Sequence, residues 1–337
     1  GRLHRQRRGA LSSLRYDGRY LYWLKDGGEP GRIWVPAGAA VRKILEQSAK
    51  ELGVGAEGRG SVPAADAWRL KPVRIGLADI YGGSMTSGWT RWLLEQYEFP
   101  FEVVYPQAVD AGGLNGRFDV LLFTDGVARL GAAPSGGAPP QRGPDAAGIP
   151  AEYRAWLGRY SEDKTMPRLR EFVEGGGSVV AIGSSTSMAS LIGLPVRNHL
   201  VEKGADGSDR PLPREKYYIP GSLLRVQVDN QNPLAYGMPP AVEVVFNNSP
   251  VFRLEPDAAQ RRTRAVAWFS GPEPLTSGWA WGQRYLDGGA AVVEAAVGRG
   301  KVVLLGPEVA FRAQPHATFK LLFNSLYYGS AGEVRLP

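Results

Sequence analysis

Short, nearly continuous apolar runs are the feature of this sequence that most constrains its fold. They cover residues 73–78, 118–123, 179–182 and 302–305. A strand that is apolar on both sides is covered on both faces, as in parallel sheets flanked by helices. Strands and helices also alternate along the first half of the main domain. The sequence therefore predicts an α/β fold on a mainly parallel, flavodoxin-like sheet.

The chain has 337 residues, enough for two domains or for one large domain with an appendage. Residues 1–57 are expected to form a small N-terminal α+β unit. A Gly, Ala, Pro and Ser-rich linker is expected at 58–70, and the α/β domain at 71–330. Within that domain, the Gly, Ala and Pro-rich segment 126–150 has no periodicity and is predicted to be a flexible loop.

Local signals place the individual elements. In the small unit, Asp26-Gly27-Gly28 predicts a hairpin turn, and a helical pattern at 41–52 ends at Gly53. In the main domain, Ser87 is expected to cap a helix that runs to Tyr97. Four later strand-like runs predict an antiparallel extension of the sheet, followed by a final helix: 223–228, 242–246, 265–269, 291–296, and 317–328 for the helix.

Composition limits the possible partners. The apolar share is 43% and the charged share 22%, as in soluble globular proteins. No apolar run approaches the roughly 18 residues of a membrane span, so none is predicted. The net charge of +7 is partly local to the start of the chain, which is interpreted as a solvated end. Nucleic acid is therefore not predicted as a partner. The basic residues in that run are Arg2, Arg5, Arg7 and Arg8.

Metal and thiol chemistry are not expected. The chain has no cysteine, which excludes disulfides, a thiolate nucleophile and cysteine-bound metal. Its three histidines are His4, His199 and His316, and none has a partner at the spacing of a zinc motif. The sequence predicts neither a metal nor a cofactor in this segment.

A nucleophilic serine is the first enzymatic alternative. The apolar run at 179–182 leads into Gly183-Ser184-Ser185 and a predicted helix, the layout of a nucleophile elbow. Ser184 or Ser185 would be the nucleophile and His316 the candidate base. However, Ser187 stands where the elbow motif has its second glycine. Serines that only cap a helix are the favoured interpretation.

Two polar loops are candidates for ligand binding. Ser84, Thr86, Trp89 and Arg91 follow the first strand of the main domain, where open α/β sheets often hold an anion. They either line a polar crevice or only cap and pack.

Glu308 and Arg312 follow the last apolar run. They are expected to pair with each other in preference to binding a polar ligand.

Several segments resemble the C-terminal region of large bacterial carboxypeptidase-A-type zinc peptidases. The resemblance covers roughly residues 30–330 and keeps the order of the segments. In that family the zinc-binding catalytic domain lies upstream, and its ligands match no residue here. The segments that carry the resemblance are Ser87-Gly88-Trp89-Thr90-Arg91-Trp92, Phe118-Asp119-Val120-Leu121, Leu194-Pro195-Val196-Arg197-Asn198, Pro220-Gly221-Ser222-Leu223-Leu224, Pro233-Leu234-Ala235-Tyr236-Gly237-Met238 and Phe319-Lys320-Leu321-Leu322-Phe323-Asn324.

The same region resembles a class I glutamine amidotransferase domain. That resemblance would place the catalytic Cys at Ser184 or Ser185, the His at Gly306 and the Glu at Glu308. Only the glutamate matches, so the resemblance implies the fold without the activity.

Three hypotheses follow. The leading one is a non-catalytic accessory domain that partners an upstream zinc peptidase domain and is exported with it, packing on the peptidase or binding a small polar ligand or peptide. The second is a Ser-dependent hydrolase. The third is a carbohydrate- or peptide-binding module that uses aromatic side chains, Trp279 and Trp281 among them. An exposed row of aromatic residues would favour the third.

Overall fold

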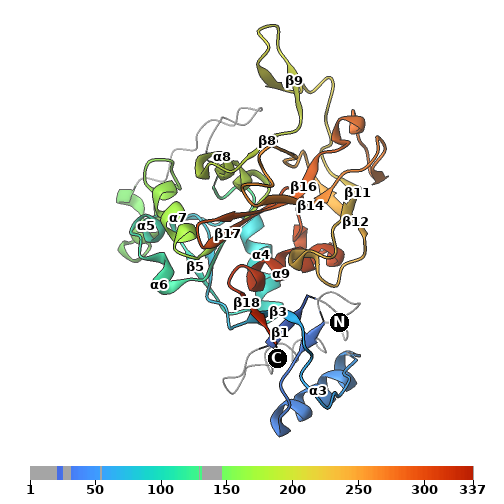
Figure 1. Ribbon diagram of the computed structural model, residues 1–337. Helices are drawn as coiled ribbons and strands as arrows, with labels where there is room; N and C mark the ends of the chain where they lie inside the picture. Colours follow the sequence, from blue (N-terminus) through green and yellow to red (C-terminus); the bar gives the residue numbers. More distant parts are fainter. Residues whose placement is uncertain (1–20, 26–31, 54, 129, 131–145, 337) are drawn as a thin grey trace.

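The computed structural model describes residues 21–25, 32–53, 55–128, 130 and 146–336, arranged around one large mixed sheet (Figure 1). Five neighbouring strands are parallel, in the spatial order β5, β4, β6, β7, β17. In chain order this is 2-1-3-4-5, the order of flavodoxin-like sheets. The predicted fold class is therefore confirmed. The strands are β4 (Ile75–Ala78), β5 (Phe101–Val104), β6 (Val120–Phe123), β7 (Ser178–Ile182) and β17 (Gly300–Leu305).

The antiparallel extension is also present and continues from β17. β16 forms a hairpin with β17, in which Val297 pairs with Gly300 and Gly298 supplies a left-handed turn residue (φ +56°). β14, β11 and β12 follow outward, all antiparallel, and three short strands pair at the margins. The strands are β16 (Ala290–Val297), β14 (Thr263–Trp268), β11 (Ser222–Val228), β12 (Ala241–Phe246), β8 (Val196–Asn198), β13 (Phe252–Leu254) and β15 (Leu275–Ser277).

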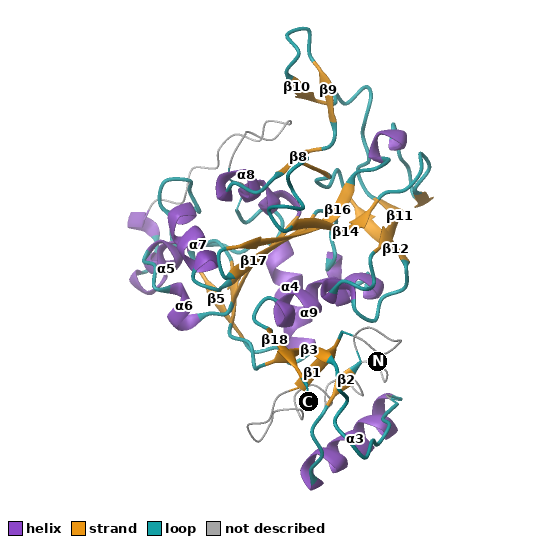
Figure 2. Ribbon diagram, viewed as in Figure 1, coloured by secondary structure: helices purple, strands orange, loops and turns teal. Residues whose placement is uncertain are grey.

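Helices cover both faces of the parallel strands (Figure 2). The alternating residues of β6 demonstrate this, because Leu122 joins one core cluster with Leu93 and Leu322, whereas Phe123 joins the other with Leu169. Two covered faces explain why these strands are apolar throughout. One face carries α4 (Met85–Gln96) and α9 (Phe319–Tyr328), and the other α5 (Pro106–Asp110), α6 (Leu114–Arg117), α7 (Thr165–Glu174) and α8 (Met188–Ile192).

A second, four-stranded sheet corrects two predictions. Its order is β18, β3, β1, β2. The expected linker at 58–70 is wrong in its last five residues, because these form β3. The small unit is also not purely N-terminal, because β18 lies beyond the expected domain end at residue 330 and pairs with β3. The strands are β1 (Leu21–Leu24), β2 (Ile33–Trp34), β3 (Asp66–Leu70) and β18 (Gly332–Arg335).

Aromatic packing explains why β3 belongs to this sheet. Trp23 is buried against Tyr236 and Tyr327 of the main domain, and Trp68 of β3 meets Tyr328 edge-on with 4.9 Å between ring centroids. The helix α3 (Ala39–Leu52) ends at Gly53 in a left-handed conformation, as predicted. The expected hairpin turn at 26–28 lies outside the described residues, although β1 and β2 do pair antiparallel.

The remaining features lie at the periphery. A hairpin of β9 (Val201–Lys203) and β10 (Asp209–Pro211) projects from the body (Figure 2, top). Of the loop predicted at 126–150, residues 129 and 131–145 lie outside the described part, whereas Val127 and Ala128 are buried. The basic run at the start of the chain also lies outside it. In the described part, no helix has the length and apolarity to cross a bilayer.

Candidate functional site

The candidate site lies where the parallel strands end. In the order 2-1-3-4-5, successive strands are added to one side of β4 and then to the other, so the strand order reverses between β4 and β6. Open α/β sheets bind ligands in the crevice beyond the carboxyl ends of the strands at this switch point. Polar residues follow the strands there. We define the carboxyl-edge site as Asp79 after β4, Thr86 on α4, Asp125 after β6, Gly183 after β7 and Glu308 after β17.

The start of α4 ties two of these loops together. Ser84 is the N-cap and accepts a hydrogen bond from the backbone N–H of Ser87 at 3.0 Å, so the prediction that Ser87 caps the helix is wrong. The Ser84 hydroxyl lies 3.1 Å from that of Thr86, which donates to the backbone oxygen of Asp125 at 2.6 Å. These two predicted residues therefore do reach the switch point, where they join α4 to the loop after β6.

The other predicted residues of α4 also face this edge. Trp89 packs edge-on against Phe311, with 5.3 Å between ring centroids. The positive charge of Arg91 acts on Asp79, which is 3% exposed. Burial raises the pKa of Asp79, while a hydrogen bond from the Ile80 N–H and the charge of Arg91 oppose the rise. Sequence reasoning had not singled out Asp79.

The strand-to-helix turn after β7 is built on a glycine. β7 ends at Ile182, and Gly183 has φ +57°, the left-handed conformation of a tight turn. A β-carbon at this position would lie 2.4 Å from Oδ1 of Asp125. Neither Ser184 nor Ser185 occupies the turn position, which the sequence pattern had placed one or two residues too late. The residue at the tip of the elbow has no side chain, and the Asp125 carboxyl fills the space.

The serines hold a neighbouring segment of backbone. Ser184, Ser185 and Ser187 accept hydrogen bonds from the N–H groups of three alternate residues, 126, 128 and 130, at 2.9, 3.1 and 3.0 Å. Ser185 is fully buried and also donates to the Thr124 carbonyl at 2.6 Å. The prediction that these serines cap the helix is wrong, because no serine here accepts a hydrogen bond from the helix N-terminus. Their partners belong to the loop after β6 and are not the helix amides that a cap would use.

Two carboxyl groups face each other at the centre of the site. Glu308 is 8% exposed and forms a side-chain hydrogen bond with Asp125. Burial, then the charge of Asp125 and that hydrogen bond, raise the pKa of Glu308 to about 8. At neutral pH Glu308 therefore keeps its proton and donates it to Asp125. Asp125 also accepts a hydrogen bond from the backbone N–H of Ser184 at 2.6 Å.

The expected ion pair between Glu308 and Arg312 is not present among the described side chains. Glu308 turns to Asp125, and the guanidinium of Arg312 lies over the Phe311 ring, 5.2 Å from its centroid. Arg312 and Ala313 both have positive φ, +49° and +53°. Two consecutive non-glycine residues in this conformation are unusual, and such strain tends to occur at functional sites.

His316 is exposed on the turn before α9. Its ring stacks on Phe319, with 5.0 Å between centroids. The proton of the Ser185 hydroxyl is already donated to a carbonyl, so the predicted transfer from Ser185 to His316 would first have to break a buried hydrogen bond. Within the residues that the structure describes, no group of three His, Asp or Glu side chains is placed to hold a metal ion.

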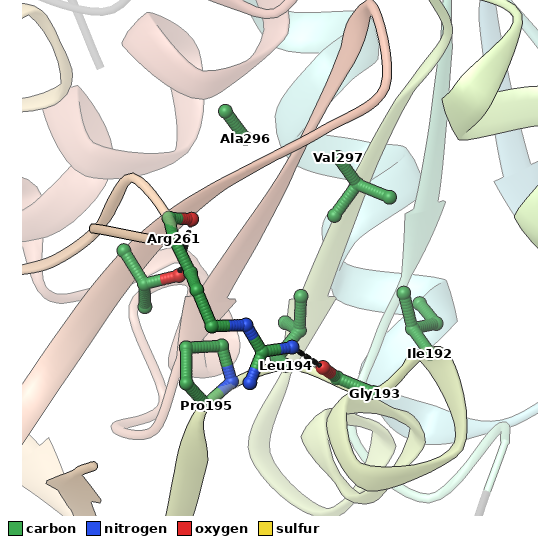
Figure 3. Close-up of a pocket in the computed structure, with 8 residues that line it drawn as sticks. Ile192, Gly193, Leu194, Pro195, Arg261, Ala296 and Val297 are labelled. Atoms are coloured by element: carbon green, nitrogen blue, oxygen red, sulfur yellow. Dashed lines mark hydrogen bonds between the residues drawn. The ribbon is translucent and has the colours of Figure 1, made fainter. Parts of the chain in front are cut away.

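The cavity drawn in Figure 3 lies outside the carboxyl-edge site, and none of its lining residues is an acid or a histidine. It measures about 210 Å³ and is lined by residues from the end of α8, the turn after it and the end of β16, with Arg261 and Thr263. Its charged side chain, Arg261, crosses the space and donates to the Gly193 carbonyl. A wider depression of about 670 Å³ lies beside α5. The carboxyl-edge site has the stronger claim because the buried carboxyl of Glu308 meets that of Asp125 there.

Known proteins resemble this chain only in general fold. No family model matches it, and neither does any curated protein. A putative GMP synthase subunit from Thermoplasma acidophilum has a TM-score of 0.42 at 11% identity, covering 76% of this chain and 93% of its own. A glutamine amidotransferase from Thermotoga maritima has a TM-score of 0.39 at 11% identity, with 75% and 82% covered.

A β-galactosidase from Bacillus circulans sp. alkalophilus has a TM-score of 0.40 at 10% identity, and the match covers 86% of this chain but 34% of that one. None of these three carries a carboxypeptidase description. The peptidase resemblance therefore stays a prediction, and activity has to be argued from this chain's own residues.

Proposed function

We propose that this chain is a non-catalytic accessory domain of a zinc carboxypeptidase-like protein and that its carboxyl-edge site binds a polar ligand. The observation that supports the proposal best is the glycine at the strand-to-helix turn. Gly183 supplies no nucleophile, and Asp125 occupies the space that a side chain there would need. An elbow without a reactive group cannot form the covalent intermediate of acyl transfer.

The Ser-dependent alternative is weaker on the same geometry. A serine nucleophile needs an accessible oxygen and a base that takes its proton. Ser185 is fully buried and donates its proton to the Thr124 carbonyl, and Ser184 accepts from the Gly126 N–H. Both hydroxyls hold the segment after β6.

The site is suited to a ligand that donates hydrogen bonds. Carboxyl oxygens of Asp79, Asp125 and Glu308 gather at one edge of the sheet, and Arg91 is the cation whose charge acts on Asp79. Carboxyl oxygens that carry no proton accept hydrogen bonds, so an amine, an amide or a polyol would complement them. A bound amine would also stabilise the ionised form of Glu308.

Turnover measurements test the absence of hydrolysis. The purified chain is incubated with glutamine, with p-nitrophenyl acetate and with a peptide that has a free C-terminus, and its zinc content is measured. We expect no zinc, no released C-terminal residue, and ester hydrolysis equal to that of a Ser184→Ala, Ser185→Ala double variant. Turnover that either serine substitution abolishes, or zinc at one equivalent with peptide cleavage, would refute the proposal.

The partnership needs its own test. The accessory role predicts that the chain co-purifies with a zinc carboxypeptidase domain encoded immediately upstream of it, and that the two are exported together. If such a domain is present and the two neither associate nor alter each other's peptide cleavage, the accessory role is wrong. Ligand binding at the carboxyl edge could still hold.

A further inference from the structure

An exposed cluster of aromatic rings lies on the antiparallel half of the molecule, away from the carboxyl-edge site. We define the aromatic platform as Tyr218, Trp279 and Trp281. Trp279 and Trp281 are 54% and 53% exposed, although tryptophan is usually well buried. The rings of Tyr218 and Trp279 are in contact, with 6.1 Å between centroids. So much apolar ring surface left in water marks an interaction site.

Tyr218 links the two tryptophans, because its ring contacts that of Trp279 and its backbone pairs with that of Trp281. Tyr218 and Trp281 face each other across an antiparallel bridge, exchanging N–H to carbonyl hydrogen bonds of 3.0 and 3.1 Å. Residues opposite each other in such a pair project to the same face. Between the two tryptophans, Ala280 packs against the core. Trp279 and Trp281 are both exposed whereas Ala280 is partly buried, so the two tryptophan side chains lie on the solvent side of this segment.

The backbone beneath the rings is fixed at several points. The Ser222 hydroxyl donates to the Trp279 carbonyl at 2.6 Å and accepts from its N–H at 3.0 Å. The Trp281 indole N–H donates to the Glu215 carbonyl at 2.7 Å. A β-carbon at Gly282 would lie 2.0 Å from the Lys216 carbonyl, so the two segments are in close contact. The rings are therefore held in place before any ligand arrives, which lowers the entropic cost of binding.

We propose that the aromatic platform is a carbohydrate-binding site, on which pyranose rings stack against the indole faces of Trp279 and Trp281. A pyranose offers an apolar face of C–H groups and a rim of hydroxyls. The platform offers flat apolar faces, with charged donors and acceptors at its edge. Arg214 lies over the Tyr218 ring at 3.9 Å, and Lys216 pairs with Glu202 beside it. Two outward rings in a row suit a chain of linked sugars.

A proline-rich peptide is the competing occupant, and the hydrogen bonding favours the sugar. Peptide backbone has carbonyl groups that need donors from the surface that binds it. The indole N–H of Trp281, the donor nearest the ring face, is already used on the Glu215 carbonyl. What Trp281 still offers is its apolar face, and stacking uses only that face.

The test uses isothermal titration calorimetry with cellohexaose and chitohexaose on the full chain. We expect at least one of them to bind, and Trp279→Ala and Trp281→Ala each to weaken binding about tenfold or more, as removal of a central aromatic contact does. Trp92→Ala is the matched control, because Trp92 is an exposed tryptophan (45%) on α4 outside the platform. It should leave the affinity within about twofold. Equal melting temperatures for the three variants would show that the fold is intact.

Three outcomes would overturn the proposal. One is that neither hexasaccharide binds the wild-type chain. Another is that a proline-rich decapeptide binds and loses affinity in the platform variants while the sugars do not, which would make this a peptide site. The third is a dimer in sedimentation that Trp281→Ala dissociates, which would make the platform an interface between two copies. Failure of any kind here leaves the proposal for the carboxyl-edge site untouched, because no residue is shared.

Discussion

The carboxyl groups at the two ends of strand β6 have opposite surroundings. Asp119, just before the strand, accepts hydrogen bonds from the Arg74 backbone N–H at 3.0 Å, from its guanidinium at 3.0 and 3.1 Å, and from Lys71 at 2.9 Å. Burial alone would raise the pKa of Asp119, but these donors outweigh it and lower the pKa to about 2. Asp125, just after the strand, faces the carboxyl of Glu308, whose pKa is raised to about 8.

The difference distinguishes a carboxyl group whose charge the fold fully satisfies from a pair that it leaves without a donor for both charges. At the amino end every donor is supplied by the fold, so the ionised form stabilises the native state. At the carboxyl end one proton is shared between two acids, and the ionised pair is unfavourable until a ligand or cation arrives. Groups held in an unfavourable state by their surroundings are typical of binding and active sites. The backbone differs in the same way. Strain is found near the carboxyl end, where Arg312 and Ala313 have positive φ.

The largest effect on the free energy of unfolding is expected from adding a side chain at Gly183, beside Asp125. Gly183→Ala places a β-carbon 2.4 Å from the Asp125 carboxyl, at a backbone conformation that L-residues disfavour. We expect a loss of about 3 kcal/mol in the free energy of unfolding, measured by urea denaturation. Gly88→Ala, in α4 with open space around it, is the control and should stabilise by about 0.5–1 kcal/mol. Equal stability of the two variants would mean that Asp125 does not fill the turn.

A smaller loss is expected at the amino end. Asp119→Asn removes the charge that Arg74 and Lys71 hold and should cost about 2 kcal/mol at pH 7, less than the full pKa shift implies because both cations are half-exposed. The ordinary pKa of 3.8 is lowered to about 2, so this stabilisation is present above pH 4 and is lost as pH falls toward 2. Asp66→Asn, whose ion pair with Arg335 is exposed, should change stability by less than about 0.5 kcal/mol. A deficit for Asp119→Asn that persists at pH 2 would contradict the assignment.

The smallest effect on the free energy of unfolding, with the opposite sign, is expected from removing the titratable group of Glu308. Folded Glu308 keeps its proton to about pH 8, whereas the unfolded chain releases it near 4.5, so the unfolded state binds fewer protons in between. Wild-type stability should therefore fall as pH rises from 4.5 to 8. Glu308→Gln keeps the hydrogen bond without the charge. It should be about 1–2 kcal/mol more stable than wild type at pH 9 and equal to it at pH 4.

A substitution at Asp125 separates the two causes of the raised pKa of Glu308. Because burial is the larger cause of the raised pKa and Asp125 the smaller, Asp125→Asn should lower the midpoint of the pH dependence without abolishing it. Urea midpoints measured at each pH give both curves. A stability difference between Glu308→Gln and wild type that is the same at pH 4 and pH 9 would rule out the shared proton.

The sheet was predictable because its signal is local. Each central strand is a short run that is buried on both faces, as Val120 to Phe123 illustrate. Burial on both faces requires apolar residues at every position, and such a run can be recognised in the sequence. The antiparallel strands β11 and β12 alternate between buried and more exposed residues. β18 was missed because its sequence, Gly-Glu-Val-Arg, is mostly polar and its place depends on pairing with β3, far away in the chain.

The site was only partly predictable, for a related reason. Thr86 and Glu308 were found because polar residues after an apolar strand lie at the ligand edge of such sheets. Asp125 satisfies the same rule and could have been found with it. Its contact with Glu308 depends on strand order, which periodicity does not specify. The elbow was misplaced although the predicted strand end, Ile182, is the end of β7. The Gly-x-Ser-x-Gly motif assigns the turn to a serine, whereas in this chain the first glycine, Gly183, has the positive φ.

The contact between Gly183 and Asp125 makes a nucleophile at this turn hard to introduce by stepwise mutation. A thiol or hydroxyl placed at residue 183 first collides with the carboxyl. Shrinking residue 125 first removes the acceptor for the Ser184 N–H. Each single substitution destabilises the fold, and only the two together could give a reactive group with room around it. The effects of substitutions at the two positions are therefore not additive. Redesign of this domain as a hydrolase would have to change both residues at once.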